Sequence, residues 1–257
     1  MIRNRRDGVG QEPPAIGGGQ VKNGRFLIVN ADDFGMSPAV NRGVIEAHER
    51  GIVTSASLLV RWPGAKEAAD YAVRRPELGL GLHLDLGEWA WDGSEWRPIY
   101  ERVSLDDPSA IADEVDRQLR AFRELVRRDP THLDSHQHVH QREPTRGVVL
   151  AFSKALGVPL RGCTEKVRYW GAFYGQTTNG EPHSVGIEVE TLLELLNEVP
   201  MGITELACHP GADDKPGQRY GAERAFETVT LCDARVRAAI AERGIALCSF
   251  ADRRVFA

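Results

Sequence analysis

The sequence predicts an α/β fold with a parallel sheet or barrel, because short apolar strand patterns alternate with amphipathic helix patterns along most of the chain. Residues 26–29 form an apolar, β-branched run that is typical of a buried parallel strand. Ser37 and the proline after it mark the start of a helix that extends to about residue 51. A strand over 54–60 and a short helix over 65–74 continue the alternation.

Five leucines at alternate positions between Leu78 and Leu86 predict the third strand. Because strand side chains alternate between two faces, the leucines share one face, while His83 and Asp85 lie on the other. The other positions of that second face are glycines, so we expect His83 to stand among small residues.

The remainder of the chain continues the same alternation. The stretch 87–107, which holds Trp89, Trp91 and Trp96, is expected to be a loop. Further helices are expected over 108–128, 144–156, 189–198 and 230–243, and further strands over 131–140, 159–161, 205–209 and 245–250.

Composition limits the class of protein. The 257 residues are 42% hydrophobic, which is enough to bury the core of one large domain or two small ones. Residues 1–24 are glycine-rich and carry four basic and two acidic side chains, a net charge of +2, which predicts a disordered leader before a single domain over 25–257. Taken from the total of −5, this leaves −7 on the folded part and argues against nucleic acid as a partner.

No segment of the sequence is long and apolar enough to cross a bilayer, and the N-terminus lacks the apolar stretch of a secretion signal. We therefore expect no membrane partner and a cytoplasmic location. The four cysteines, Cys163, Cys208, Cys232 and Cys248, form no closely spaced pair. In a chain of this size without a secretion signal, they are expected to be reduced, half-buried apolar residues rather than metal ligands.

Four of the eight histidines lie between residues 132 and 140. On an extended backbone, alternate residues of this stretch point to the same side: His132, Asp134, His136, His138 and His140. Such a face suits a divalent metal, because imidazole nitrogen binds zinc-like ions and a neighbouring carboxylate can orient the rings. A polar, solvent-exposed edge strand, or a chance enrichment in histidine, is the simpler alternative.

Asp32 and Asp33 end the first predicted strand, and their side chains diverge because they are adjacent. One of them can hold a metal while the other faces the reacting group. Metal-assisted hydrolysis uses such a pair, because an unligated carboxylate removes the proton of a water that the metal activates. The alternative is that one aspartate only caps the turn before Phe34 and Gly35.

His209 follows another apolar run and precedes a Pro-Gly turn signal. A single histidine in that position is more often structural. However, functional groups of α/β folds gather at the carboxyl ends of strands, which favours one shared site here. The residues that end predicted strands are Asp32, Asp33, His83, His136 and His209.

Taken together, several segments resemble one known family. The motifs, in order, are Leu27–Ser37, Gly51–Ser55, Gly81–His83, Thr131–His140 and Cys208–Pro210. They closely resemble the YdjC-like carbohydrate deacetylases, which include the chitooligosaccharide deacetylases. The resemblance extends from about residue 25 to the C-terminus, and it implies a distorted (β/α) barrel similar to polysaccharide deacetylases.

The resemblance also implies an activity and site residues. The reaction is hydrolysis of the N-acetyl group from an amino sugar in a short chitin-type oligosaccharide, with a divalent metal ion such as Mg or Zn. Asp32 is implied as the catalytic base, and His209 as a general acid or oxyanion partner. The implied metal ligands are Asp33, His83 and His136, with His138 as the alternative to His136, and the implied substrate contacts are His138 and Tyr174.

Two other functions remain as alternatives. A metal-dependent phosphoesterase can use the same Asp and His set, but the acidic balance offers no clear basic cluster for phosphate. A catalytically silent sugar-binding protein is the other alternative, although an unligated carboxylate beside a metal does not serve binding. The tryptophans of 87–107 suit a sugar site and equally suit a loop that packs on the barrel. A homodimer is expected from the resemblance.

Overall fold

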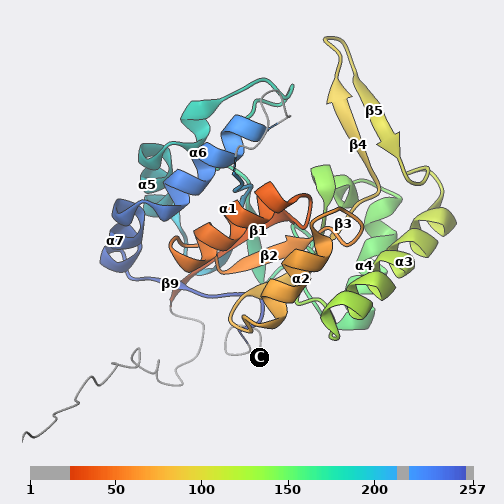
Figure 1. Ribbon diagram of the computed structural model, residues 1–257, viewed down its shortest axis with the longest axis horizontal. Coiled ribbons are helices and arrows are strands. Elements are labelled where there is room, and N and C mark those ends of the chain that lie inside the picture. The colour runs from red at the N-terminus through yellow and green to blue at the C-terminus, as the bar shows by residue number, and fades with distance from the viewer. Residues whose placement is uncertain (1–23, 213–219, 253–257) are drawn as a thin grey trace, which may run out of the picture.

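A computed structural model describes residues 24–212 and 220–252 of the chain, so all but the last residue of the expected leader lies outside the described residues. Strands and helices alternate along the described chain (Figure 1). The strands are β1 (Arg25–Phe34), β2 (Ser55–Leu58), β3 (Gly79–Leu84), β4 (Gly87–Trp91), β5 (Trp96–Glu101), β6 (Leu133–Ser135), β7 (Val167–Trp170), β8 (Gly202–Cys208) and β9 (Ile245–Leu247). The α-helices are α1 (Pro38–Glu49), α2 (Ala65–Val73), α3 (Pro108–Val126), α4 (Thr145–Leu156), α5 (Val189–Glu198), α6 (Gly221–Cys232) and α7 (Ala234–Glu242), and the 3-10 helices are η2 (His136–Gln141) and η3 (Ser184–Ile187).

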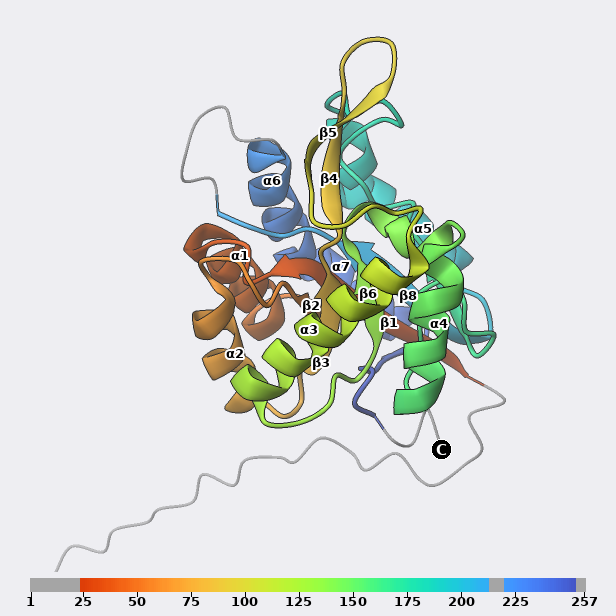
Figure 2. The same ribbon diagram turned by 90° about the vertical axis from the view of Figure 1, so that its right-hand side faces the viewer.

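Seven strands form one curled parallel sheet in the order β6-β3-β2-β1-β8-β7, with β9 pairing to β1. The helices lie around the outside of this sheet, as two views at right angles show (Figures 1 and 2). This arrangement confirms the predicted α/β fold with a barrel-like sheet. Because the strands are parallel, the carboxyl ends of β1, β3, β6 and β8 meet at one edge, where the functional groups of such folds gather.

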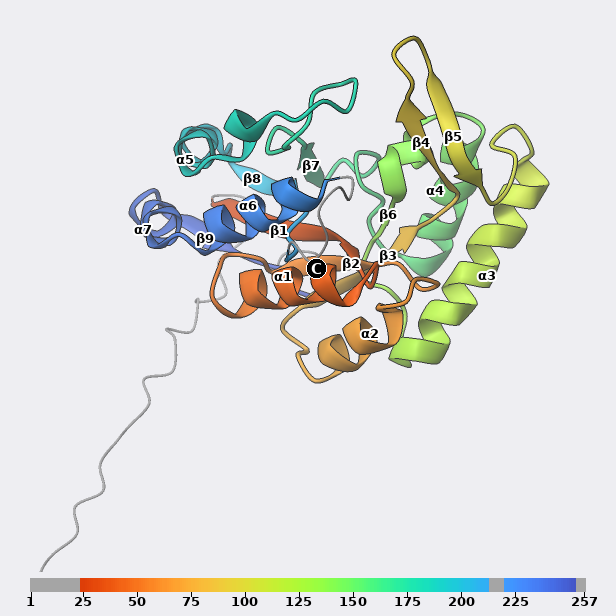
Figure 3. The same cartoon turned by 45° about the horizontal axis from the view of Figure 1, so that its top comes forward.

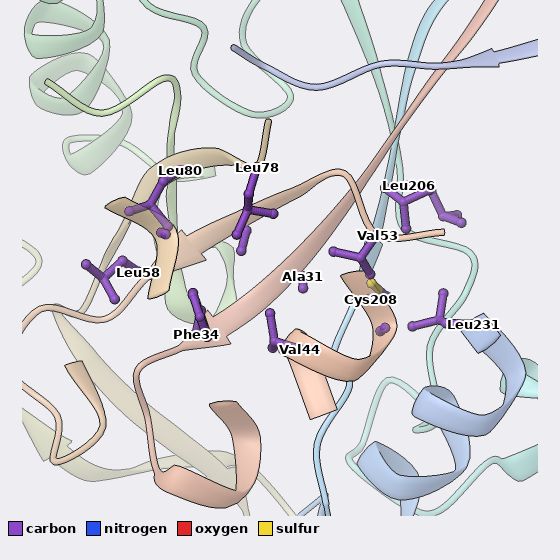
Figure 4. Packing of buried hydrophobic residues seen from close by; sticks show 14 of the residues in the cluster. Ala31, Phe34, Val44, Val53, Leu58, Leu78, Leu80, Leu206, Cys208 and Leu231 are labelled. Atoms are coloured by element: carbon purple, nitrogen blue, oxygen red, sulfur yellow. The ribbon is translucent and has the colours of Figure 1, made fainter. Parts of the chain in front are cut away.

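The core lies between the sheet and its helices. Figure 4 shows Ala31 and Phe34 of β1 beside Val44 of α1, with Leu58 of β2 and Leu206 of β8 to either side. All five side chains are buried. Burial of such apolar surface is the main stabilising contribution to the fold, and it fixes the strand ends that carry the polar residues.

The start of α1 and the leucine strand are as predicted. Ser37 Oγ accepts a hydrogen bond from the Val40 backbone N–H at 3.2 Å and so caps α1. The five alternating leucines are all buried, and the opposite face of β3 is buried too, His83 included. A Cβ atom at Gly81 would lie only 2.4 Å from the His132 ring, and one at Gly79 only 2.6 Å from Ser55 Oγ, so close neighbours explain the glycines on that face.

Residues 131–140 do not form one strand, which corrects the prediction of a single histidine-lined face. The strand β6 ends at Ser135. The Oγ atom of Ser135 accepts a hydrogen bond from the His140 backbone N–H at 3.1 Å. Gln137 and His138 have φ values of 50° and 55°, in the left-handed region. The backbone therefore turns after β6, and the alternate residues separate to different surroundings.

The expectation of a loop over 87–107 is also wrong. The strands β4 and β5 form an antiparallel hairpin, in which Trp91 and Trp96 are direct cross-strand partners. The hairpin projects beyond the main sheet (Figure 3). Alternate aromatic residues on either side of Gly93, whose φ is 103°, are the hairpin signal in the sequence.

Three smaller expectations differ from the structure. The expected strand 159–161 contributes one isolated bridge, between Leu160 and Leu133, and β7 takes its place next to β8. The expected helix 230–243 is two helices, because Asp233 caps α7 by accepting a hydrogen bond from the Arg235 backbone N–H at 2.8 Å. The last strand, β9, covers only three residues of the range that was expected.

The cysteines and the helices bear on two further expectations. All four cysteines lie in the described residues and are free thiols there. Cys208 and Cys248 are buried, whereas Cys163 and Cys232 are half-buried. Among the helices of residues 24–212 and 220–252, none is both long and apolar enough to span a membrane.

Candidate active site

The carboxyl ends of β1, β3 and β6 bring three of the expected metal ligands together. Asp33 Oδ1 lies 3.2 Å from His83 Nε2 and 3.1 Å from His136 Nδ1. One donor atom from each residue lies within 4.8 Å of the other two. Ligand atoms at about 2.0–2.2 Å from one ion lie within about 4.4 Å of one another, so the donors are close to the spacing that a divalent ion requires.

The backbone of Asp33 aims its carboxylate at this group. Its φ of 62° is in the left-handed region, which an aspartate tolerates better than most residues. Arg224 Nη2 donates to Asp33 Oδ2 at 2.5 Å and leaves Oδ1 to the imidazoles. Burial alone would raise the pKa of Asp33, but Arg224 and His136 hold that pKa well below its usual range. The carboxylate is therefore anionic, as a metal ligand must be.

His83 is oriented from its other ring nitrogen. Its Nδ1 donates to Asp134 Oδ1 at 2.8 Å, and Ser57 Oγ lies 3.2 Å away. This leaves Nε2 to face Asp33, which is the carboxylate–histidine arrangement that supports metal-ligating histidines. Burial alone would lower the pKa of His83, but Asp134 and Asp33 raise it to about 10, so the site already stabilises positive charge there.

Asp32 is held by a buried arginine. Arg161 Nη1 and Nη2 donate to the two carboxylate oxygens at 2.5 and 2.7 Å, and Asn30 Nδ2 donates to Oδ1 at 2.9 Å. Burial alone would raise the pKa of Asp32, but Arg161 lowers it. His209 Nε2 lies 3.8 Å from Asp32 Oδ2. The two adjacent aspartates thus have separate partners, as the sequence predicts.

Arg161 is the centre of a buried ion cluster. Besides Asp32, its guanidinium lies 2.8 Å from Asp134 Oδ2 and 2.7 Å from Glu205 Oε1. Burial raises the pKa of Glu205 to about 7, although Arg161 opposes the shift. Arg161 thereby links the carboxylate that orients His83 to the carboxylate beside His209.

His209 is positioned by α6. Its backbone N–H donates to Glu227 Oε2, and its Nδ1 lies 4.0 Å from Glu227 Oε1. The rings of Tyr174 and Tyr220 lie 5.2 and 5.4 Å from the imidazole. Burial lowers the pKa of His209 to about 4, so the ring is neutral at pH 7. The His209 ring therefore lies beside Asp32 and is not one of the three donors grouped around Asp33.

The other histidines of the 132–140 segment lie in different surroundings. His140 donates from Nε2 to the Arg161 carbonyl at 3.0 Å and accepts at Nδ1 from Ser135, 2.6 Å away, so it is structural. His132 is buried and stacks on Phe250, with ring centroids 4.0 Å apart. His138 Nε2 lies 3.1 Å from the Tyr169 hydroxyl, away from the Asp33 group.

Tyr174, an expected substrate contact, lies beside the site. Its ring stacks on Tyr220 at a centroid distance of 5.1 Å and is 37% exposed. The Tyr220 hydroxyl accepts from the Gly175 backbone N–H at 2.7 Å and donates to Glu227 at 2.5 Å. The loop that carries Tyr174 is therefore tied to the carboxylate that positions His209.

The donor atoms of a second group, Asp32, His83 and Asp134, also lie within 4.8 Å of one another. It already contains the guanidinium of Arg161, which pairs with both carboxylates. All three residues are buried, whereas His136 of the first group is 14% exposed. A divalent ion therefore fits the first group, where two imidazoles and one carboxylate oxygen converge and solvent has access.

Sequence reasoning missed the charged residues that hold this site. Glu205 carried a usable signal, because an acidic side chain inside an apolar strand requires a buried cation. Arg161 is the last residue of the expected strand 159–161. It could therefore have been predicted to lie near the site, as the other residues at strand ends were. Arg224 and Glu227 lie on a helix with no distinctive spacing, and only the tertiary structure reveals them.

The comparisons with known proteins agree with the fold and the motifs. The family model of the YdjC-like protein matches residues 26–242. A chitooligosaccharide deacetylase from Serratia marcescens is 34% identical, covering 89% of this chain and 99% of its own length. A carbohydrate deacetylase from Geobacillus stearothermophilus is 32% identical, covering 89% of this chain and 98% of its own length.

Solved structures share the architecture. A crystal structure from Enterococcus faecalis, described as that of a candidate cellobiose-phosphate cleavage protein, has a TM-score of 0.71 and 31% identity, covering 88% of this chain and 98% of its own. A family 4 carbohydrate esterase from Streptomyces lividans, in complex with acetate, has a TM-score of 0.53 at 11% identity over 88% of this chain and 92% of its own, which shows a common fold alone. On the family model and these relatives, the chain belongs to the YdjC-like protein family.

Proposed function

We propose that the chain is a metal-dependent carbohydrate N-deacetylase that releases acetate from an amino sugar in a short chitin-type oligosaccharide. The observation that carries the proposal is the Asp33–His83–His136 donor group beside Asp32, a carboxylate outside that group. The deacetylase names of the Serratia marcescens and Geobacillus stearothermophilus relatives support the same reaction class.

Asp33, His83 and His136 would hold the ion. Their mixed carboxylate and imidazole donors suit Zn, and a site with open positions also accepts Mg. A bound divalent ion supplies Lewis-acid polarisation of an amide carbonyl and activation of water at neutral pH. Arg224 keeps Asp33 anionic and fixed, and Asp134 keeps the Nε2 atom of His83 directed at Asp33 Oδ1.

Asp32 is the proposed base. Arg161 lowers the pKa of Asp32, so the group is ionised and able to accept a proton from the attacking water. The same arginine fixes the direction of the carboxylate through two hydrogen bonds. A base that is already positioned loses no entropy when the substrate binds.

His209 is proposed to act on the other side of the reacting carbonyl. Burial lowers its pKa to about 4, so at neutral pH the ring is a neutral imidazole. A neutral N–H can donate a hydrogen bond to the developing oxyanion, which favours the oxyanion role over that of a general acid. Tyr174 and His138 stay as proposed substrate contacts. The homodimer stays a prediction from the resemblance, and the cytoplasmic location stays a prediction from the sequence.

Acetate release tests the proposal. The protein is incubated with N-acetylated mono- and oligosaccharides, once with added divalent metal and once after chelation. We expect release that requires the metal and returns when metal is restored. A folded, metal-loaded protein that releases no acetate from any of these sugars would contradict the proposal.

A further inference from the structure

The tryptophans of the β4–β5 hairpin share one face. Trp91 and Trp96 are direct cross-strand partners, and the next pair on the same face is Trp89 with Pro98. The Trp91 and Trp96 rings meet edge to face at a centroid distance of 6.1 Å. Trp96 is 45% exposed. We call Trp89, Trp91 and Trp96 the tryptophan face.

The base of the hairpin is fixed to the end of β3 by a buried carboxylate. Asp85 accepts hydrogen bonds from Trp62 Nε1 and the Tyr100 hydroxyl, each at 2.9 Å, and from Arg102 Nε at 2.8 Å. A two-stranded hairpin alone is at best marginally stable in water. These bonds hold the tryptophan face in one place relative to the strand that carries His83.

The hairpin also joins the segment that carries the proposed ligand His136. The Trp89 backbone N–H donates to Gln137 Oε1, and Gln137 Nε2 donates to the Trp89 carbonyl, both at 2.9 Å. Gln137 directly follows His136 at the turn after β6. The tryptophan face therefore begins next to the candidate site and leads away from it.

The far end of the face approaches the loop that carries Tyr174. This loop is closed by a bridge between Gln176 and Pro182, and the Cβ position of Gly180 lies 3.9 Å from Trp96 Cη2. The hairpin and this loop lie close together in Figure 2. Tyr174, near His209, and Trp96, on the hairpin, are both exposed, and the loop that carries Tyr174 also reaches Trp96.

Charge at the hairpin disfavours an anionic ligand. Arg97 pairs with Glu95 at 2.7 Å and also with Asp92, so one cation faces two carboxylates and the turn keeps a net charge of −1. Aromatic rings with an apolar face and a polar edge suit ligands that are partly apolar and partly hydroxylated. A sugar ring has both kinds of surface.

We propose that the tryptophan face is a distal subsite for the sugar rings of an oligosaccharide beyond the one that is deacetylated, with Trp96 as its main contact. This inference rests on the proposed function and deepens it, because it makes chain length a determinant of substrate choice. Stacking on one aromatic ring is worth about three- to tenfold in affinity.

The test compares chain lengths. Trp96→Ala, Trp96→Phe and the parent are assayed for acetate release on N-acetylglucosamine oligomers from one to five units. Ile99→Ala is the matched control, because it removes an exposed apolar side chain, 49% accessible, from the same strand. Binding of the same oligomers is measured by calorimetry with a chelator present, so that binding is recorded even without turnover.

We expect Trp96→Ala to lower kcat/KM and affinity by about three- to tenfold for the longer oligomers while the shortest is unchanged, with Trp96→Phe intermediate and Ile99→Ala at the parent level. Equal loss at every length, or no loss at any, would overturn the subsite. A Trp96→Ala variant that changes only the molar mass in light scattering would also overturn it and assign the face to a second copy. If the parent releases no acetate at all, the proposed function fails, and the calorimetry still decides the subsite.

Discussion

Two groups of possible metal ligands share His83 at the edge of the sheet, Asp33–His83–His136 and Asp32–His83–Asp134. They differ in how arginine pairs with their carboxylates. Asp32 and Asp134 are both paired with the buried guanidinium of Arg161. Asp33 receives Arg224 on one oxygen only and leaves the other to two imidazoles. The same residue types thus make a structural ion cluster on one side and a candidate metal site on the other, and the placement of an arginine decides between them.

The substitution Arg161→Met tests this difference and has the largest expected effect. Asp32, Asp134 and Glu205 would then be left buried without their counter-charge. We expect the free energy of unfolding to fall by about 3–5 kcal/mol, measured by urea denaturation. Arg146→Met, at an exposed position of α4, should change it by no more than about 0.5 kcal/mol. Similar small effects of both changes would show that Arg161 does not hold the cluster together.

His209 lies beside Asp32, so its replacement should affect the reaction and not metal binding. His209→Gln should reduce kcat by about a hundredfold, because the proposed hydrogen bond to the oxyanion is lost. Metal affinity should stay at the parent level, since His209 lies outside the Asp33 group. His183→Gln, at an exposed histidine, is the control and should leave kcat unchanged. A variant that loses metal but retains kcat when metal is in excess would contradict this assignment.

Asp134 connects the two groups through His83. Asp134→Asn removes the anion that orients His83, so metal affinity should fall by about 10- to 100-fold, as measured by calorimetric titration. Asp129→Asn, at an exposed aspartate, should leave the affinity unchanged. An Asp134→Asn variant with the parent's affinity would show that His83 needs no carboxylate to hold its orientation.

The pH dependence of stability is the smallest expected effect. Burial lowers the pKa of His132, His140 and His209 to about 4 and that of His138 to about 3, so only the unfolded chain takes up these four protons as the pH falls from 6.5 to 5. Burial raises the pKa of Glu205 and Glu227 to about 7, which acts in the opposite direction.

These four imidazoles outnumber the two carboxyls, so the metal-free protein should lose stability towards pH 5, by about 1.4 kcal/mol per pH unit for each net proton. Denaturation with a chelator at pH 5, 6 and 7 measures this slope. The Glu205→Gln variant, which lacks one opposing group, should show a steeper loss. A stability that rises towards pH 5 would contradict the neutral state of the buried imidazoles.

The parts of the site that depend on parallel strand ends could be predicted from the sequence. Asp32, Asp33, His83 and His136 each lie at or beside a strand end, and parallel pairing alone brings such positions to one edge. His209 was brought to the same edge by the same reasoning. Periodicity was sufficient here because it depends on local backbone geometry.

The rest depended on the tertiary structure. Alternation along 131–140 predicted one face, but Gln137 and His138 adopt left-handed backbone without a glycine to signal the turn. Arg161 can be buried because carboxylates from three strands, β1, β6 and β8, surround it, and no spacing in the sequence records that arrangement. Sequence patterns report local backbone periodicity, and they carry little information about ion pairs between distant segments.

The central claim is that the two adjacent aspartates have different roles: Asp33 is a metal ligand, and Asp32 is the catalytic base. The most direct measurement is metal binding and acetate release of Asp32→Asn and Asp33→Asn side by side. The account predicts that Asp32→Asn binds metal with the parent's stoichiometry and loses activity by about two to four orders of magnitude, whereas Asp33→Asn loses the metal and the activity together. An Asp32→Asn variant that loses the metal, or an Asp33→Asn variant that keeps it, would contradict the account.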